Sequence, residues 1–586
     1  MKGNFFSELK RRNVYKVAVA YGVVGWLVIQ VTATIVPALH LPDGLTTAVV
    51  VLVLVGFPIA LVISWAFEMT PEGLKRTANI SADEVQSMPY WSKKKFAAFV
   101  VGVAVIAGGL FAYQLLRAPR STTVSKSDNK SIAVLPFVDI SPAKDQEYFC
   151  DGISEEILDT LAQVEGLRVV ARTSSFSFKG KNSDVAEIAQ KLNVQNVLEG
   201  SLRREGNRIR VTAQLINARD GFHLWSETYE RELQGVFAVQ DEITRAIVDA
   251  LKVKLAVAVP AHRDLDGEAH DLYLQGLYFS NKSDEANLRK SLTLFQRALD
   301  KDPNSARAWA GIAKAWDWLS DAYMNPLDAF PLTKAAALKA IALDANNAEA
   351  HVYLADVKRV LDWDMAGADA ELRHALQLDP NSASAHLFSS LNALTQGNPE
   401  AGAAHMREAV KADPLSPLIA NLSAEAYLLR GQYDEAIAEG KRTQELDPNY
   451  IYQTSVIADA YREKEMYDEA IALFKKAQEM TGTAQPGLAV TYARIGRQSE
   501  ARQILEELKK TAATKYLPKE EIAAVYVALG EKDEAFKWLN RACDDHGGAL
   551  HAIGLRPVFR ALHSDPRFAD ILRRIGLDPA KVLSQP

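Results

Sequence analysis

The sequence predicts a multi-domain protein with three transmembrane helices, a small α+β domain and an all-α superhelix of repeated helix pairs. Three observations lead to this fold class. Long stretches without charge are confined to the first part of the chain, and strand-like and helix-like apolar patterns alternate over 131–258. From 265 to 586, Asp-Pro pairs and small residues recur with a nearly constant period. A chain of 586 residues is also too long for one hydrophobic core, so several units are expected.

The first unit, residues 1–117, contains three stretches without Asp, Glu, Lys or Arg, and we expect helices there at about 17–39, 45–67 and 96–116. Each stretch has the roughly 20 residues that a helix needs to cross about 30 Å of hydrocarbon. Three such stretches in succession argue against a signal peptide followed by core helices. Apart from His40 at the end of the first, they hold no interior acid or base, so an ion or proton pathway is not expected. The sequence therefore predicts a membrane anchor.

The basic residues that flank these stretches predict an orientation. Residues 1–16 and 68–95 each contain five Lys or Arg, whereas four follow the third stretch, up to Lys130. Because cytoplasmic loops are enriched in Lys and Arg, we expect the N-terminus inside the bacterial cytoplasmic (inner) membrane. The domains after residue 117 would then face the periplasm.

After a polar linker at 118–130, the pattern over 131–258 predicts the element order β-α-β-α-β-β-β-α. We expect KSIAVLPF to be the first strand, a loop over 139–152, and a helix of about 12 residues that begins at Ile153. Glu155 and Glu156 would then lie in the first turn, where carboxylates oppose the positive end of the helix dipole. The turn EGNR predicts a hairpin within an antiparallel ribbon.

Several segments of this unit resemble a known family. They are SIAVLPF, YFCDGISEEI, LRVVARTSSFSFKG, NVLEGSLRREGNRIRVTAQLINARDGFHLWSETYER and FAVQDEI. Over about 131–255 the chain resembles the N-terminal domain of TolB and the TolB-like domain that precedes tetratricopeptide arrays. The resemblance implies no catalytic residues. Relatives are often labelled adenylate cyclases because some carry a cyclase domain at the N-terminus, but the apolar stretches occupy that place here.

The remaining chain carries two periodic signals. Helix-ending Asp positions follow one another at intervals of 42, 35, 34 and 34: Asp302, Asp344, Asp379, Asp413 and Asp447. Small side chains fall at every 34th position: Ala368, Gly402, Ala436 and Ala470. A period of 34 is the tetratricopeptide signature, and a Pro after the Asp ends the helix. We expect an insertion around 321–331, a break or bend at TGTAQPG, and a capping helix in SDPRFADILRRIGL.

The first helix of each repeat is expected to line the concave face of the superhelix, where a protein partner would bind. The register predicts these groove residues: Asn421, Glu425, Leu428, Tyr452, Ser455, Asp459 and Arg462. The alternative is that each lies on an ordinary solvated helix face.

No sequence pattern points to catalysis. The chain has no phosphate loop, HExxH, GxSxG or GxGxxG, and its two cysteines, Cys150 and Cys543, lie too far apart for a local motif. His262 and His270 are eight positions apart, which does not suit a shared metal ion. A net charge of −6 disfavours general nucleic-acid binding. We therefore expect no catalytic, cofactor or metal residues.

Two groups of residues that contain tryptophan occur in the repeat region. Asp362, Trp363 and Asp364 suit the bend between two repeat helices. Three tryptophans could stack between repeat helices or form an aromatic ligand cage: Trp309, Trp316 and Trp318.

The sequence as a whole predicts a membrane-anchored, non-enzymatic protein-interaction scaffold on the periplasmic side. The alternative is a signalling or regulatory subunit that couples an external domain to a cytoplasmic or membrane enzyme such as an adenylate cyclase.

Overall fold

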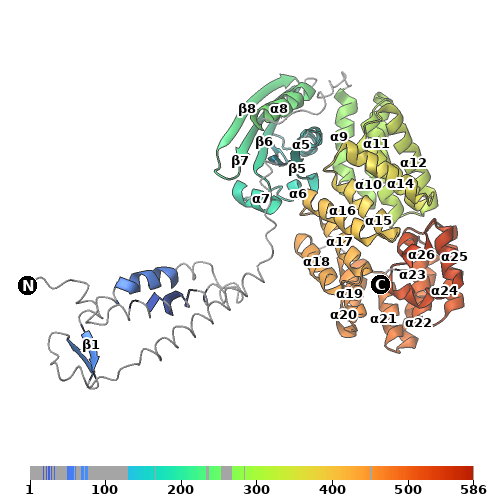
Figure 1. The fold of residues 1–586 in the computed structure, drawn as a ribbon. Helices are drawn as coiled ribbons and strands as arrows, with labels where there is room; N and C mark the ends of the chain where they lie inside the picture. The colour runs from blue at the N-terminus through green and yellow to red at the C-terminus, as the bar shows by residue number, and fades with distance from the viewer. Residues whose placement is uncertain are drawn as a thin grey trace, which may run out of the picture. The chain divides into compact units, whose positions relative to one another are not determined.

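The computed structural model describes residues 130–251 apart from 165, 182 and 233–235, residues 267–584 apart from 283, 449 and 451, and short pieces between positions 18 and 76. The chain divides into two compact units, Met1–Ser127 and Asp128–Pro586. Each unit is described by itself below (Figure 1).

In the first unit, the described pieces include helical residues at 49–58 and an antiparallel pair of strands, β1 (Phe67–Thr70) and β2 (Gly73–Arg76). The hydroxyl of Tyr21 donates a hydrogen bond to the carbonyl oxygen of Val53 at 3.1 Å. The expected spans 17–39 and 45–67 lie partly outside the described residues, and 96–116 lies wholly outside them. Among the helices that are described, none combines the length and the apolar character needed to cross a membrane.

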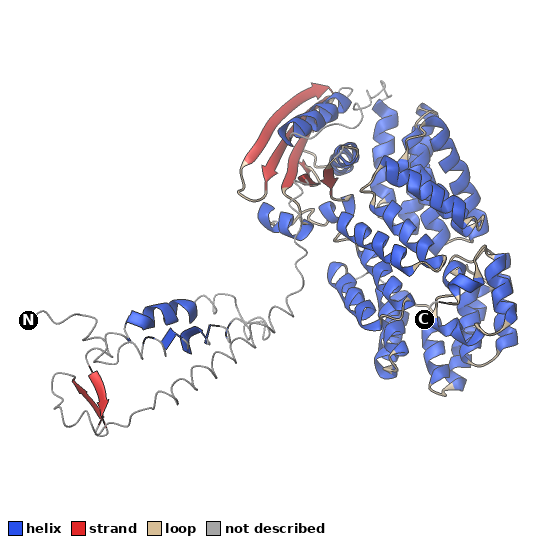
Figure 2. Cartoon of the chain, viewed as in Figure 1, coloured by secondary structure: helices blue, strands red, loops and turns tan. Residues whose placement is uncertain are grey.

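The second unit begins with the predicted α+β domain, a mixed sheet in the order β5-β3-β6-β7-β8 whose helices cover both faces (Figure 2). β3 pairs in parallel with β5 and β6, and β6, β7 and β8 form the antiparallel ribbon. The elements in chain order are β3 (Lys130–Val134), β4 (Val138–Asp139), α5 (Glu147–Ala162), β5 (Leu167–Val169), α6 (Arg172–Phe176), α7 (Val185–Leu192), β6 (Asn196–Glu205), β7 (Arg208–Asn217), β8 (His223–Glu232) and α8 (Val236–Leu251).

The start of helix α5 differs from the sequence prediction. It begins at Glu147 and has 16 residues, so the expected loop 139–152 is shorter and already helical at its end. The prediction relied on the spacing of Ile and Leu, which begins at Ile153. The first turns of α5 are buried through Phe149 and Cys150 instead, so the aliphatic pattern did not reveal them. As a result, Glu155 and Glu156 lie in the middle of the helix, and the predicted role at the helix dipole is wrong.

The rest of the second unit is an array of antiparallel helix pairs, as the repeat period predicts. The helices in chain order are α9 (Gly267–Ser280), α10 (Glu285–Lys301), α11 (Ala306–Ala322), α12 (Pro326–Leu343), α13 (Ala348–Val360), α14 (Met365–Leu378), α15 (Ala383–Thr395), α16 (Pro399–Ala412), α17 (Pro417–Leu429), α18 (Tyr433–Leu446), α19 (Tyr452–Glu463), α20 (Tyr467–Thr481), α21 (Pro486–Arg494), α22 (Gln498–Ala512), α23 (Lys519–Ala528) and α24 (Lys532–Asp544). They are followed by the short helices η4 (Leu550–Ala552), η5 (Pro557–Leu562), α25 (Pro566–Arg574) and α26 (Pro579–Val582).

Both periodic signals have the expected structural meaning. The recurring Asp residues are the C-cap residues of the second helix in each pair: Asp302, Asp344, Asp379, Asp413 and Asp447. The small residues mark close helix crossings: a Cβ added at Gly402 would lie 2.6 Å from Leu394 Cγ. The longest interval, between Asp302 and Asp344, is not a looped insertion. Helices α11 and α12 have 17 and 18 residues, against 13 and 14 in α13 and α14, so the additional residues lengthen both helices.

The array continues through TGTAQPG, where a break or bend was expected. Helix α20 ends at Gly482 in the left-handed conformation with φ of 66°, and α21 begins at Pro486. The ring of Phe474, which is 1% exposed, packs under Gly487, where a Cβ would lie 2.3 Å from it. The hydrophobic core is therefore continuous across this junction.

The expected capping helix is α25, which buries Phe568 and Leu572 completely. The C-terminal segment also reaches back to helices far away in the sequence. The rings of Trp363 and His546 stack with centroids 4.2 Å apart, and Gly576 lies against the carbonyl oxygen of Trp363. Trp363 has a positive φ of 53°, and Asp364 caps α14, so the bend predicted for 362–364 is confirmed.

Candidate functional site

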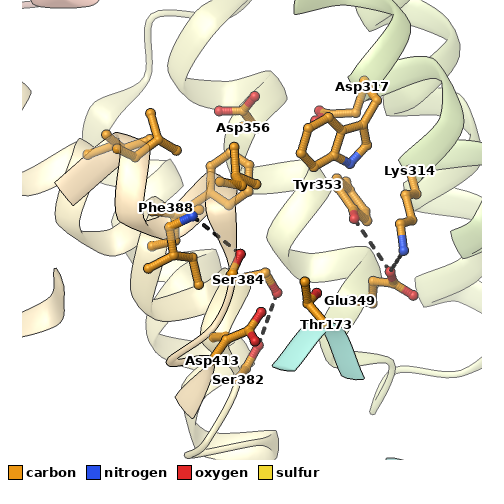
Figure 3. Close-up of a pocket in the computed structure, with 18 of the residues that line it drawn as sticks. Thr173, Lys314, Asp317, Glu349, Tyr353, Asp356, Ser382, Ser384, Phe388 and Asp413 are labelled. Carbon is orange, nitrogen blue, oxygen red and sulfur yellow. Dashed lines mark hydrogen bonds and ion pairs between the residues drawn. The ribbon is translucent and has the colours of Figure 1, made fainter. Parts of the chain in front are cut away.

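A large cavity lies inside the second unit, and we call it the central cavity. Its volume is about 2610 Å³, and its walls come from α5 and α6 of the α+β domain, from the first helices of successive repeats, and from the segment around η4 and η5. Figure 3 shows part of the wall, which includes Lys314, Asp317, Glu349, Tyr353 and Phe388.

The local sequence explains where the first helices of these repeats begin. In the repeats that follow α10, α12, α14 and α16, a Ser or Asn comes shortly after the helix-ending Asp. Its side chain accepts a hydrogen bond from a backbone N–H of the first turn, as an N-cap does. These capping residues line the central cavity: Ser305, Asn347, Ser382 and Ser416.

Six of the seven predicted groove residues line the central cavity: Asn421, Glu425 and Leu428 on α17, and Ser455, Asp459 and Arg462 on α19. The side chain of Tyr452 lies outside the described residues. These six residues therefore lie in the cavity wall, and their role in binding a partner stays a prediction.

These residues are less solvated than a surface helix face would be. Asn421 and Arg462 are each 5% exposed. Arg462 Nη1 lies 2.5 Å from Asp459 Oδ1, and Arg462 Nε lies 3.1 Å from Glu463 Oε1. Burial raises the pKa of Asp459, while the nearby guanidinium of Arg462 opposes that shift. Arg462 is thus part of a buried ion network as well as of the cavity wall.

A second charge network at the cavity wall joins the α+β domain to the repeats. Glu155 Oε2 accepts a hydrogen bond from Arg172 Nε at 2.7 Å, and Glu156 Oε1 accepts one from Arg307 Nη1 at 2.8 Å. Both carboxylates are buried, with 8% and 3% exposure. Local sequence could not reveal this role, because the partner of Glu156 is 151 residues away.

Helix α6 fixes the α+β domain to the array through neutral and charged hydrogen bonds. The backbone N–H of Ala171 donates to Ala412 O at 2.8 Å. The backbone N–H and the hydroxyl of Ser174 both donate to Asp413 Oδ1, at 2.9 and 2.5 Å. The hydroxyl of Ser174 also accepts from the N–H of Leu415 at 2.7 Å. Asp413 therefore ends a repeat helix and also holds the neighbouring domain.

A third group of polar side chains in the cavity wall lies on α11 and α13 and just after α9. Lys314 Nζ donates to Asn281 Oδ1 at 2.9 Å and lies 3.8 Å from Glu349 Oε1. The hydroxyl of Tyr353 donates to Glu349 Oε1 at 3.4 Å. Burial raises the pKa of Tyr353 well above its ordinary value, and Glu349 adds to that effect. This part of the wall offers carboxylates beside aromatic rings (Figure 3).

The tryptophans and histidines considered from the sequence lie in different surroundings. Trp309 donates its indole N–H to Pro303 O at 3.3 Å, Trp309 and Trp316 pack against repeat cores, and Trp318 lines the cavity. His262 lies outside the described residues, whereas His270 is buried beside Glu156. In the part of the chain that the structure describes, no group of three or more His, Cys, Asp and Glu could hold a metal ion.

The two cysteines are buried and not joined. Burial raises the pKa of the Cys150 thiol, and it raises the pKa of Cys543 to about 11. Neither has the low pKa of a reactive thiol.

Three family models match parts of the chain. One, described as the second domain of HilA/YgeH-like transcriptional regulators, matches residues 127–246. Two tetratricopeptide repeat models match residues 390–451 and 456–483.

A protein of Rhizobium meliloti (strain 1021), described as "Putative adenylate cyclase 3", is 40% identical over 225 residues, which are 37% of this chain and 38% of that protein. The match thus spans well under half of that relative.

Solved structures of repeat proteins are also similar. PilW, a type IV pilus biogenesis factor, has 16% identity and a TM-score of 0.31 over 38% of this chain and 96% of its own. YrrB, a TPR protein with an unusual peptide-binding site, has 18% identity and a TM-score of 0.23 over 32% of this chain and 91% of its own. The helix pairs, their regular period and the two matching repeat models together identify the C-terminal region of this chain as a tetratricopeptide repeat array.

Proposed function

We propose that this chain is a membrane-anchored, non-enzymatic scaffold that binds a protein partner in the central cavity. The observation that carries the proposal is the cavity itself. The inner helices of several repeats and helix α5 enclose it, and its wall mixes paired charges with half-buried polar and aromatic side chains. Such walls suit recognition of a polypeptide segment, which is how helical repeat proteins use their concave face.

The anchor and the topology are part of the proposal. The apolar stretches at 17–39, 45–67 and 96–116 would hold the chain in the inner membrane, and the Lys and Arg pattern favours a periplasmic second unit. The α+β domain would be TolB-like, as the segments over 131–255 suggest. The HilA/YgeH-like match names transcriptional regulators, but a net charge of −6 gives no support for DNA binding by this chain.

A cavity-filling substitution tests the binding proposal. Ser455 lines the cavity and is half-buried, so Ser455→Trp would fill part of the cavity without removing a buried ion pair. Ser499→Trp is the matched control, because Ser499 is exposed at the start of α22. The full-length protein, purified in mild detergent, is used to capture partners from the cells that make it. Loss of captured protein with Ser455→Trp and retention with Ser499→Trp is expected. Equal capture by both variants would refute the cavity as the binding site.

A second function is favoured by one comparison. The 40% identity to a protein described as a putative adenylate cyclase suggests a regulatory subunit that passes the state of the outer domain to a cyclase. Deleting the gene and measuring cyclic nucleotide levels distinguishes the two functions: a change supports the regulatory subunit, and unchanged levels count against it.

A further inference from the structure

The central cavity carries an excess of negative charge. Among the described residues that line it are thirteen carboxylates and nine basic side chains. Several of the basic side chains are already held by carboxylates within the protein: Arg172 by Glu155, Arg359 by Asp356, Arg462 by Asp459 and Arg556 by Glu521. These cations of the wall are thus engaged. Several carboxylates are also held within the protein, such as Asp413 by Ser174 and Glu349 by Lys314, so the surplus that is open to a ligand is smaller than the count of residues.

Asp159 is the clearest member of this surplus. It lies on α5 and lines the cavity with its side chain exposed, and it has no hydrogen-bond or ion-pair partner among the described residues. The surrounding walls, with the nearby carboxylates of Glu155 and Glu349, raise its pKa well above the ordinary value, which Arg307 only partly offsets. A cation placed beside Asp159 would relieve this unfavourable environment for its ionised form.

Two other side chains of the cavity wall indicate which kind of positively charged molecule would bind. Asn421 is 5% exposed, and its Oδ1 has no hydrogen-bond partner in the described structure. Arg359 is 6% exposed, and its Nη1 likewise has none, although its Nε donates to Asp356 Oδ1 at 2.9 Å. Both residues line the cavity, and buried polar atoms are normally paired. One offers an acceptor and the other a donor, which are the two groups that complement a peptide unit.

The size and the hydrogen bonding together favour an extended chain. Pockets for small molecules have volumes of about 300–1,000 Å³, and the central cavity, at about 2610 Å³, is more than twice as large. A helical segment satisfies its own backbone groups, so it would leave Asn421 Oδ1 and Arg359 Nη1 unpaired. An extended segment presents free N–H and C=O groups to them.

We propose that the central cavity binds an extended, positively charged polypeptide segment, with a Lys or Arg of that segment pairing with Asp159. The inference rests on the proposed function and adds the chemistry of the partner. It also makes helix α5 of the α+β domain part of the binding site, so both parts of the second unit contact the same ligand.

The test uses fluorescence anisotropy with the full-length protein and labelled peptides as probes. One probe is a twelve-residue peptide of alternating Ser and Lys, and the other is its Ser–Glu counterpart. Tighter binding of the Ser–Lys peptide is expected, and Asp159→Asn should weaken it roughly five- to tenfold, at or above the upper end for an accessible ion pair. The matched control is Asp369→Asn, since Asp369 is exposed on α14, is 3.0 Å from Arg373 and does not line the cavity. Asn421→Ala should also weaken binding, by removing the acceptor for the peptide backbone.

The outcomes separate this inference from the proposed function. Equal affinity for the two peptides, or equal losses for Asp159→Asn and Asp369→Asn, overturns the inference. Spermidine that binds as tightly as the Ser–Lys peptide overturns the polypeptide part of it. If Ser455→Trp blocks capture of the natural partner while the two peptides bind alike, the proposed function stands and the charge inference falls. Thermal melts of each variant show whether a loss reflects unfolding instead, and Asn421→Ala then gives an independent readout of the same site.

Discussion

The hydroxyl of Ser174 is the most informative single contact to remove, because it links the α+β domain to the repeat array. It donates to Asp413 Oδ1 at 2.5 Å and accepts from the N–H of Leu415 at 2.7 Å. Ser174→Ala removes both bonds and leaves a carboxylate oxygen and an amide with one partner fewer.

The expected cost follows from these two bonds. A hydrogen bond to a carboxylate contributes about 1.5–3 kcal/mol, and an amide left unpaired costs about 1–3 kcal/mol. The two costs combine to about 2.5–6 kcal/mol. Leu415 is only half-buried, so we expect the lower part of this range, a loss of about 2.5–4 kcal/mol in the docking of α6 on the array. This corresponds to a roughly 60- to 700-fold increase in the opening of the contact.

Hydrogen exchange read by mass spectrometry measures this opening in the full-length protein. Amides of 171–176 and 412–416 should exchange faster in Ser174→Ala, while the α18–α24 helices keep their protection. Ser177→Ala is the control, since the hydroxyl of Ser177 donates only to Ser174 O within the same segment, at 2.8 Å. Protection in Ser174→Ala that equals that of Ser177→Ala would refute the assignment of Ser174 and Asp413 as the attachment point.

Further predictions concern stability and topology. Phe474→Ala should lower the free energy of unfolding by about 3–5 kcal/mol in urea titrations, because the ring is 1% exposed. Phe222, which is 72% exposed, is the control, and Phe222→Ala should change the free energy of unfolding little. Similar losses for the two variants would contradict continuous packing at the α20–α21 junction. Burial raises the pKa of Glu520 from 4.5 to about 7. Between these pH values the folded state holds a proton that the unfolded state releases. The free energy of unfolding should therefore fall by up to about 3 kcal/mol as the pH rises from about 4.5 to 7. Glu520→Gln should remove that part of the slope in urea titrations at several pH values, and an unchanged slope would contradict it. An alkaline phosphatase fused after Pro586 should be active in cells if the second unit is periplasmic, and an inactive fusion that is stably made would reverse the topology.

Much of the fold could be predicted because its signals are local or periodic. The Asp-Pro and small-residue series predicted the helix ends at Asp302 and Asp447 and the close crossing at Gly402, since steric limits act within each helix pair. Counting from Ala436 and Ala470 also located six residues that line one wall of the cavity.

The errors arose where tertiary contacts decide the outcome. Phe149 and Cys150 extend α5 beyond the stripe of aliphatic residues, and this moved Glu155 and Glu156 away from the helix end. Their actual partners, Arg172 and Arg307, belong to other elements, and no local pattern encodes such pairing. The same holds for the stacking of Trp363 on His546, which joins the bend before α14 to the segment after α24.

The most direct test of the central claim is photo-crosslinking from inside the cavity in living cells. Phe388 lies on α15 and lines the cavity (Figure 3), so p-benzoylphenylalanine at position 388 places a photoreactive ring there. The control carries p-benzoylphenylalanine at position 373, because the side chain of Arg373 is 67% exposed and does not line the cavity. A scaffold that holds its partner in the cavity predicts a discrete protein adduct from position 388, absent from position 373 and lost on adding Ser455→Trp. No adduct from position 388, or the same adduct from both positions, would contradict the account.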